Sequence, residues 1–248
     1  MFYDIDLPDK SAALWFFGQA GYYLKAQGHG ILIDPYLSDS VGRSDVRFAR
    51  QYPSPVQAGD IKADIYIVTH DHLDHLDPET IAQYRYKDST QFVAPRFAAK
   101  KLAVLGVPKG NIHICDSGDS IELDGVIIKG VFALGTSPDV LDTTGYLISF
   151  PNGKSVYHSS DTAYCRLLLE ACPHADVLLV CINGKDGNLN VQEAVEMTKA
   201  VDPLYVIPNH YDMMALNAEN PEVFQYYCGE AGIEKKCVIM SVIDPFIW

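Results

Sequence analysis

Short apolar runs separated by glycine turns dominate the first third of the chain. Residues 12–17, 22–25 and 31–34 are rich in aromatic and β-branched side chains, and Gly18-Gln-Ala-Gly21 and Gly28-His-Gly30 separate them. Runs of this kind are typical of strands, and short glycine-containing segments connect strands as turns. The pattern therefore predicts a series of antiparallel strands.

From residue 65 onward, strands alternate with helices. The apolar run 65–68 leads into a polar loop, after which Asp77 and Pro78 are the cap and first turn of a predicted helix. Residues 91–94 predict another strand, which is followed by a helix from Pro95.

The rest of the chain continues both patterns. Helices are predicted from Asn190, which forms a candidate capping box with Glu193, and from Asn220. Two groups of strands, each followed by helices, predict an α/β fold in which two mixed sheets pack face to face with helices outside, in one domain spanning residues 1–248. The further predicted strands are residues 121–123, 126–132, 146–150, 155–158, 177–182 and 204–207, with a last apolar run at 238–243.

Composition and charge narrow the class of protein. The net charge is −13, and the Lys and Arg residues are scattered, which argues against a nucleic-acid groove. The N-terminus has neither a basic region nor a continuous apolar stretch, and no later segment has 18 uninterrupted apolar residues, so we expect a cytoplasmic protein that does not enter a membrane. Six cysteines without a CxxC pair fit a reducing compartment. The 15 tyrosines and 10 phenylalanines leave material for a homo-oligomer interface.

The most informative segment is a histidine-rich loop after the strand at 65–68. His70, His72, Asp74 and His75 lie within six positions of one another. Neutral imidazole and ionised carboxylate are ligands for divalent cations, whereas clustered imidazoles gain nothing from one another without an ion. We therefore favour a metal site over the alternative, a solvated polar loop.

Two more candidate ligands follow later strands. Asp161 comes after the strand at 155–158, and His210 after the strand at 204–207. Taken alone, Asp161 fits a helix N-cap and His210 fits a structural histidine equally well. Because ligands at strand ends of one sheet can converge on one rim, their common placement favours a shared metal site.

These residues resemble a known family. His70, His72, Asp74 and His75 match the HxHxDH signature of the metallo-β-lactamase superfamily, and the resemblance continues through residues 33–35, 157–162 and 206–210. It implies a four-layer αβ/βα sandwich, in agreement with the predicted sheets. The turn at 18–21, the segment 157–161 and the loop 182–188 look most like the branch that contains bacterial L-ascorbate 6-phosphate lactonase.

The resemblance also implies a ligand set, from which this chain departs at one place. The dinuclear pattern has a further histidine in the loop before the strand beginning near Gly145, and residues 131–139 contain none. The site built on His70 and His72 therefore lacks its third protein ligand, and one tightly held Mn²⁺ or Zn²⁺ is expected rather than two. The second site keeps Asp74, His75, His210 and the bridging Asp161. Asp34 resembles the superfamily's early aspartate, which braces the ligand loop, although an Asp before Pro also forms turns.

The predicted function is metal-assisted hydrolysis of a small anionic metabolite, with a sugar-acid lactone phosphate as the specific expectation. Asp74 or Asp161 is expected to orient the attacking water and to take its proton. Alternatives are a phosphodiesterase acting on a small phosphodiester and a non-catalytic metal-binding or sensing protein. Candidate substrate-binding residues are His158, Asn183, Lys185 and Tyr211.

Overall fold

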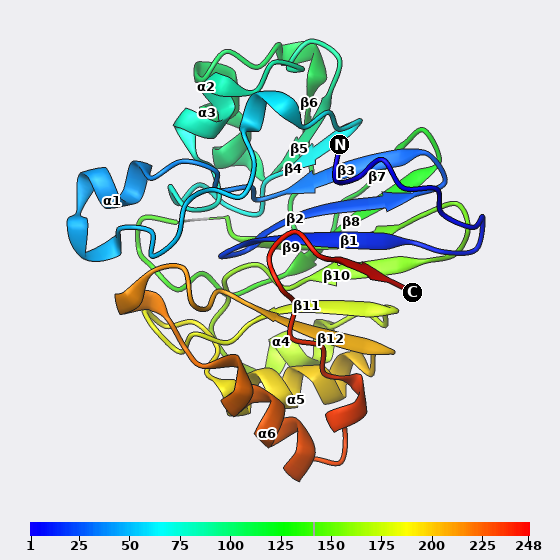
Figure 1. The fold of residues 1–248 in the computed structure, drawn as a ribbon, viewed down its shortest axis with the longest axis vertical. Helices are drawn as coiled ribbons and strands as arrows, with labels where there is room; N and C mark the ends of the chain where they lie inside the picture. Colours follow the sequence, from blue (N-terminus) through cyan, green and yellow to red (C-terminus); the bar gives the residue numbers. More distant parts are fainter. Residues whose placement is uncertain (141) are drawn as a thin grey trace.

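Two mixed β-sheets packed face to face form the centre of the protein, seen here in a computed structural model that describes residues 1–140 and 142–248 (Figure 1). The first sheet has the strand order β13-β1-β2-β3-β4-β5-β6, and the second has the order β12-β11-β10-β9-β8-β7. The first sheet comprises β1 (Ala13–Gly18), β2 (Gly21–Ala26), β3 (His29–Ile33), β4 (Ile65–Ile67), β5 (Gln91–Ala94), β6 (Ile112–Ile114) and β13 (Pro245–Ile247). The second comprises β7 (Ser120–Leu123), β8 (Val126–Phe132), β9 (Thr144–Ser149), β10 (Ser155–His158), β11 (Val177–Cys181) and β12 (Tyr205–Asn209).

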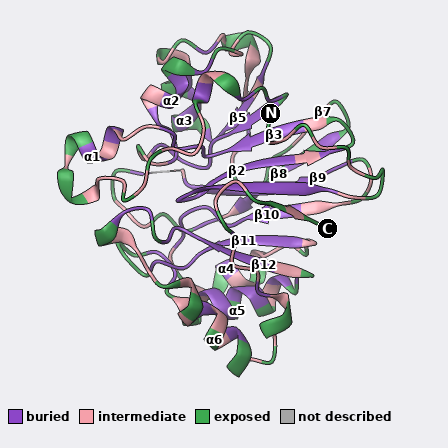
Figure 2. Ribbon diagram, viewed as in Figure 1, coloured by how far each residue is buried: buried purple, intermediate pink, exposed green. Residues whose placement is uncertain are grey.

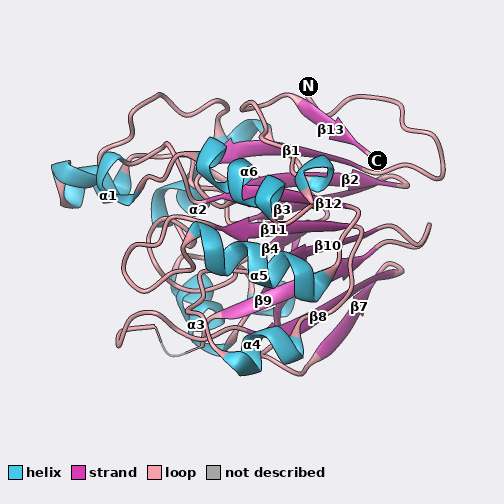
Figure 3. Ribbon diagram, turned by 90° about the horizontal axis from the view of Figure 1, so that it is seen from below, coloured by secondary structure: helices cyan, strands magenta, loops and turns pink. Residues whose placement is uncertain are grey.

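Helices cover the outer faces of the two sheets. The helices α2 (Pro78–Gln83) and α3 (Arg96–Val104) lie at one end of the view, and α5 (Val191–Val201) and α6 (Pro221–Glu230) lie at the other (Figure 1). The sheets lie between them, α4 (Arg166–Ala171) lies beside α5 (Figure 1), and α1 (Ser40–Ser44) stands clear of the strands (Figure 3). This is the predicted αβ/βα arrangement, and the fold prediction is confirmed.

Alternation along β1 shows why both faces of the first sheet are covered. Leu14 and Phe16 pack in the core between the sheets, whereas Trp15 and Phe17 pack in the separate cluster under α2 and α3. Successive side chains of a strand point to opposite faces, so an uninterrupted apolar run is buried on both sides. Figure 2 shows the consequence, with the central strands buried along most of their length.

The predicted hairpins and capped helices form as expected. β1, β2 and β3 pair in antiparallel fashion, and Asp77 caps α2 by accepting a hydrogen bond from the Glu79 amide. Asn190 and Glu193 form the predicted capping box at the start of α5. The glycine turns and helix caps predicted from the sequence are therefore consistent with the way the elements pack in the fold.

The end of the chain and one helix start differ from the sequence pattern. The last apolar run, 238–243, forms no strand; Val242 makes only an isolated bridge to Phe16, and the edge strand is β13. Pro95 is the N-cap of α3 rather than its first helical residue. No helix in the described part of the chain has the length and apolar character needed to cross a membrane.

Candidate metal centre

The carboxyl ends of parallel strands bring the candidate ligands together. β4 leads into the loop carrying His70 to His75, β10 leads to Asp161, and β12 leads to His210. β3, β4 and β5 run parallel in one sheet, and β10, β11 and β12 run parallel in the other. Strand ends of both sheets therefore meet at one rim, where α/β proteins commonly place their sites.

The candidate ligands form two overlapping groups, Asp74, His75, His210 and His70, His75, Asp161, and within each group the ligand atoms lie within 4.8 Å of one another. His210 Nε2 lies 3.2 Å from Asp161 Oδ2 and 3.4 Å from Asp74 Oδ2. His75 Nε2 lies 3.5 Å from Asp161 Oδ1 and 3.7 Å from Asp74 Oδ2. Two atoms bound tetrahedrally to one ion at about 2.1 Å are about 3.4 Å apart, so these separations match a shared ion.

Two of these atoms are buried without a hydrogen-bond partner among the described residues. They are His75 Nε2 and Asp161 Oδ1, which face each other. A buried polar atom without a partner is costly, and the cost is removed when the atom binds a cation. The donor set therefore fits a divalent metal ion.

The electrostatics of the site lead to the same conclusion. Burial disfavours protonation of His210, but the charges of Asp161 and Asp74 outweigh it and raise the pKa of His210 to about 9. Burial also lowers the pKa of His75, but the charges of Asp161, Asp74 and Asp34 have the larger effect and raise it. The carboxylates thus favour the protonated forms of His75 and His210, which together carry a charge of +2. One divalent cation would supply the same charge in place of the two protons.

Asp34 braces the histidine loop from the end of β3. Its Oδ2 lies 2.7 Å from His75 Nδ1 and accepts a hydrogen bond from Thr69 Oγ1, while its Oδ1 accepts from the Thr69 amide at 2.8 Å. The Asp34 side chain is fully buried. An Nδ1 proton held in this way leaves His75 Nε2 free to bind a metal ion.

His70 belongs to the second of the two overlapping groups, with His75 and Asp161, and His72 lies beside it. His70 Nε2 lies 3.0 Å from His72 Nδ1, which is close enough for both to bind one ion. In the loop where the superfamily pattern has its further histidine, Asp139 Oδ1 lies 3.7 Å from His72 Nε2, the nitrogen that faces away from His70. Leu141 of this loop lies outside the described residues.

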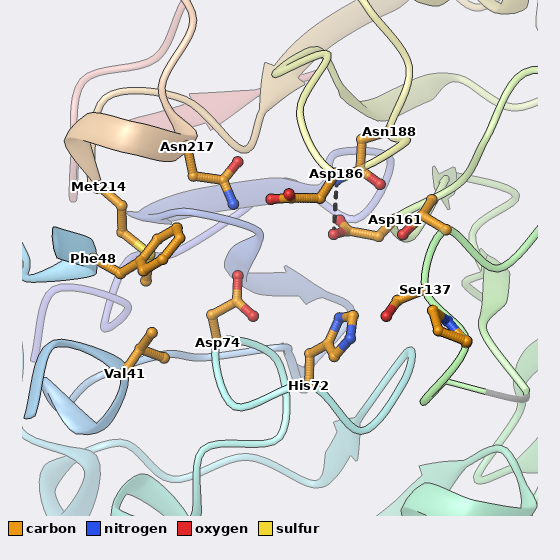
Figure 4. A pocket seen from close by; sticks show the side chains of 12 residues that line it. Val41, Phe48, His72, Asp74, Ser137, Asp161, Asp186, Asn188, Met214 and Asn217 are labelled. Carbon is orange, nitrogen blue, oxygen red and sulfur yellow. Dashed lines mark hydrogen bonds between the residues drawn. The ribbon is translucent and has the colours of Figure 1, made fainter. Parts of the chain in front are cut away.

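A pocket of about 460 Å³ opens over the ligands (Figure 4). Asp74 and Asp161 reach its floor, and Asp186 lies beside them. The opposite wall is apolar and consists of Val41, Phe48 and Met214. The remaining lining residues are His72, Thr136, Ser137, Pro138, Asn188 and Asn217.

The predicted substrate-binding residues do not line this pocket. His158 is fully buried, with its Nε2 near the Ala20 carbonyl oxygen and its Nδ1 accepting from the Ser160 amide. Tyr211 donates to the Met240 carbonyl oxygen in the core, and Lys185 is exposed outside the pocket. Asn183 is buried and donates a hydrogen bond to Asn217, which does line the pocket.

Two residues that the sequence reasoning did not select reach the ligands. Asn188 Nδ2 donates to Asp161 Oδ2 at 2.8 Å, and Gln19 Nε2 donates to Asp74 Oδ2 at 2.9 Å. Both lie in segments already noted, the turn at 18–21 and the loop at 182–188. Their polar character inside glycine-containing turns was the available signal, but such residues are also common in turns without any further role.

Five residues at the site have left-handed backbone. Gln19, Asp34, Ser160, Asp186 and His210 have φ values of 54°, 41°, 61°, 51° and 59°. Non-glycine residues rarely adopt this conformation, and where they do the strain is often found at functional sites. The unusual backbone conformations therefore occur at the same place as the candidate metal ligands.

Comparison with known proteins identifies the family. Residues 13–210 match the model of the beta-lactamase superfamily domain. The chain belongs to the beta-lactamase superfamily. It is 28% identical over 222 residues to a UPF0173 metal-dependent hydrolase of Thermoplasma acidophilum, covering 87% of this chain and 90% of that protein. It is 30% identical over 216 residues to another from Pyrobaculum islandicum, covering 84% and 88%.

A solved structure supports the superfamily fold. Igni18, described as a novel metallo hydrolase from Ignicoccus hospitalis KIN4/I, superposes with a TM-score of 0.78 at 23% identity, covering 96% of this chain and 98% of that one. Membership of the beta-lactamase superfamily was correctly predicted from the histidine signature. The relatives do not bear on the narrower resemblance to the lactonase branch.

Proposed function

We propose that this superfamily member is a metal-dependent hydrolase whose principal ion is held by Asp74, His75, Asp161 and His210. The observation that carries the proposal is the facing pair of unpartnered buried atoms, His75 Nε2 and Asp161 Oδ1, beneath an open pocket. A divalent cation there supplies a Lewis acid and makes water more acidic. Mn²⁺ and Zn²⁺ both suit this mixture of carboxylate and imidazole.

A second ion would bind more weakly. His70 and His72 offer two nitrogens 3.0 Å apart, but the loop before β9 supplies no histidine to complete the group. Asp139 faces the outer nitrogen of His72 and has an exposed side chain, so it does not close the group around an ion between the two imidazoles. One tightly held ion is therefore expected.

Asp161 and Asp74 are the groups proposed to orient the attacking water. Burial raises the pKa of Asp161, but the charges of His210 and His75 outweigh it and hold that pKa well below the ordinary range. Asp161 is therefore ionised and able to orient a water molecule by accepting a hydrogen bond from it. Asn188 fixes the carboxylate by binding its Oδ2.

The pocket favours an uncharged substrate. None of the described residues lining it is Lys or Arg, whereas Asp74, Asp161 and Asp186 are acidic. A substrate phosphate distant from the ion would meet Asp186 and no basic side chain among the described lining residues, at a cost in binding free energy. Val41, Phe48 and Met214 offer an apolar wall instead. We therefore propose a small ester or lactone with an apolar substituent, in place of the lactone phosphate expected from the sequence.

The test is hydrolysis of a panel by protein reconstituted with Mn²⁺ or Zn²⁺. The panel holds apolar lactones and esters, a sugar-acid lactone phosphate and small phosphodiesters. We expect the uncharged lactones and esters to be preferred. Asp161→Asn should lower kcat/KM by about 10²–10⁴-fold and reduce the bound metal.

Asp88→Asn is the matched control, because Asp88 is exposed after α2. It should retain full activity and full metal content. Preference for phosphodiesters would replace the lactone proposal, and no turnover above that of the free metal would favour a metal-binding or sensing protein.

A further inference from the structure

Asp186 places a third carboxylate in the pocket above the candidate metal ligands. It lies on the loop between β11 and α5 and lines the same pocket as Asp74 and Asp161. Its side chain is exposed, and Figure 4 shows its carboxylate beside Asp161 and directed toward Asn217. Asp186 therefore faces any molecule that occupies the pocket.

The proposed ion does not need the charge of Asp186. A divalent cation carries two positive charges, and its ligands Asp74 and Asp161 already carry two negative ones. Among the described residues, neither group of candidate metal ligands includes Asp186. The pocket thus keeps the negative charge of Asp186 in excess when the ion is bound.

Protein side chains do not balance this charge in the described part of the molecule. None of the described residues that line the pocket is Lys or Arg, and Lys185, the next residue along the chain, lies outside it. The ion pairs found in residues 1–140 and 142–248 do not include Asp186. A cleft with one sign of charge and low-dielectric walls concentrates ligands of the opposite sign.

The loop holds Asp186 at a fixed place relative to the metal centre. Two residues after it, Asn188 Nδ2 donates a hydrogen bond to Asp161 Oδ2 at 2.8 Å, and the Asn188 amide donates to the Lys185 carbonyl oxygen at 2.9 Å. A Cβ atom at Gly187 would lie 3.3 Å from the Thr136 carbonyl oxygen, so the loop packs closely on the opposite segment. The carboxylate of Asp186 is therefore presented by a loop that is tied to one of the proposed ligands.

The opposite wall suits the carbon chain of an amine. Val41, Phe48 and Met214 form this wall (Figure 4). The methylenes of an alkylammonium group can pack on apolar side chains while its N–H groups donate to a carboxylate, as the side chain of lysine does at protein surfaces. A purely apolar substituent would take water away from the Asp186 carboxylate without replacing its hydrogen bonds.

We propose that Asp186 selects substrates whose apolar substituent carries a protonated amine. The inference rests on the proposed function and narrows its class to amine-bearing esters or lactones. It extends the order of preference set by charge: an ammonium group binds better than an uncharged group, and an uncharged group binds better than a phosphate.

The test measures binding of paired hydroxamic acids of several chain lengths, because hydroxamates bind metal ions and need no turnover. One member of each pair ends in an ammonium group and the other in a methyl group. Calorimetric titration of the full-length protein, reconstituted with Mn²⁺ or Zn²⁺, should show tighter binding of the ammonium member at one chain length or more. Added salt should weaken this preference, since it screens the charge of an exposed carboxylate.

Asp186→Asn should reduce the ratio of the two affinities by about tenfold, the size of one hydrogen bond between charged groups. Asparagine tolerates the left-handed backbone, and Asp186→Gly replaces this variant if it does not fold. The corresponding pairs of esters should show the same change in the ratio of their kcat/KM values.

Asp124→Asn is the matched control. Asp124 is an exposed aspartate with left-handed backbone, and it lies in the turn between β7 and β8. It should keep the wild-type ratio of affinities. Equal binding of the two probes by the wild type, or an unchanged ratio in a folded Asp186 variant, would overturn the proposal.

The two proposals can fail separately. A preference for the ammonium probe that depends on Asp186, without hydrolysis of any ester, would count against the proposed function alone. Binding of neither probe by the metal-loaded protein would overturn both.

Discussion

At the scale of single residues, the centre depends on a contact that joins Asp34 to His75 across 41 positions of sequence. β3 and β4 are parallel neighbours with Ile33 opposite Ile67, so the residues that follow each strand are brought together. The Asp34 carboxylate accepts the Nδ1 proton of His75 and thereby leaves Nε2 available. In the sequence, Asp34 before a proline was recognised as a brace or a turn residue, but nothing showed that its partner would be His75.

We predict that Asp34→Asn lowers metal affinity by about 10–100-fold, the usual effect of losing a ligand's hydrogen-bond partner. An amide that donates to His75 Nδ1 would move the imidazole proton to Nε2, the nitrogen needed by the ion. Competition with a coloured chelator measures the change. Asp88→Asn serves as the reference, and equal affinity in the two variants would contradict the role given to Asp34.

At the scale of elements, the sequence predicted those whose signals are local and sustained. The hairpins from β1 to β3 and the capped helices α2, α5 and α6 formed where expected. The short elements α1, α4 and β13 were missed because they show neither a clear period nor a strong cap and depend on their packing partners. Gln19 was missed for a related reason, since a turn residue gives no sign of which distant ligand it will meet.

The loop between β11 and α5 offers a test at this scale. Asn190 accepts hydrogen bonds from the Gln192 and Glu193 amides and fixes the end of the loop that carries Asn188. We expect Asn190→Ala to lower the free energy of unfolding by about 1 kcal/mol, the typical value of an N-cap. Urea unfolding measures it. Because β10 holds Asp161 in position, the amount of bound metal in this variant should stay at the wild-type level. A loss of bound metal would show that the Asn190 cap supports the metal centre directly.

At the scale of the whole molecule, the proposed metal centre joins the two sheets. The histidine loop follows β4 of the first sheet, whereas Asp161 and His210 follow β10 and β12 of the second. Ligands from both sheets can share an ion only when the sheets are packed as in the native fold. Binding of the ion is therefore coupled to the stability of the entire fold.

Removal of the metal should accordingly destabilise the protein as a unit. At a free metal concentration 100-fold above its Kd, binding contributes about 2.7 kcal/mol to stability. Thermal unfolding with and without a chelator should show a single transition that shifts to lower temperature when the ion is removed. His210→Ala should lose the shift, and a metal-dependent shift of normal size in that variant would place the ion elsewhere.

The left-handed backbone at Gln19, Asp34, Ser160 and His210 has a consequence for protein engineering. Each such conformation costs about 1–3 kcal/mol in a non-glycine residue, and glycine would largely remove the cost. Selection for heat resistance alone would thus favour glycine at all four positions, which include His210, a proposed ligand, and Asp34, the brace of His75. Screens for more stable variants of this chain should therefore measure metal retention together with melting temperature. Substitutions that raise the melting temperature most at these positions would be the ones that abolish metal binding.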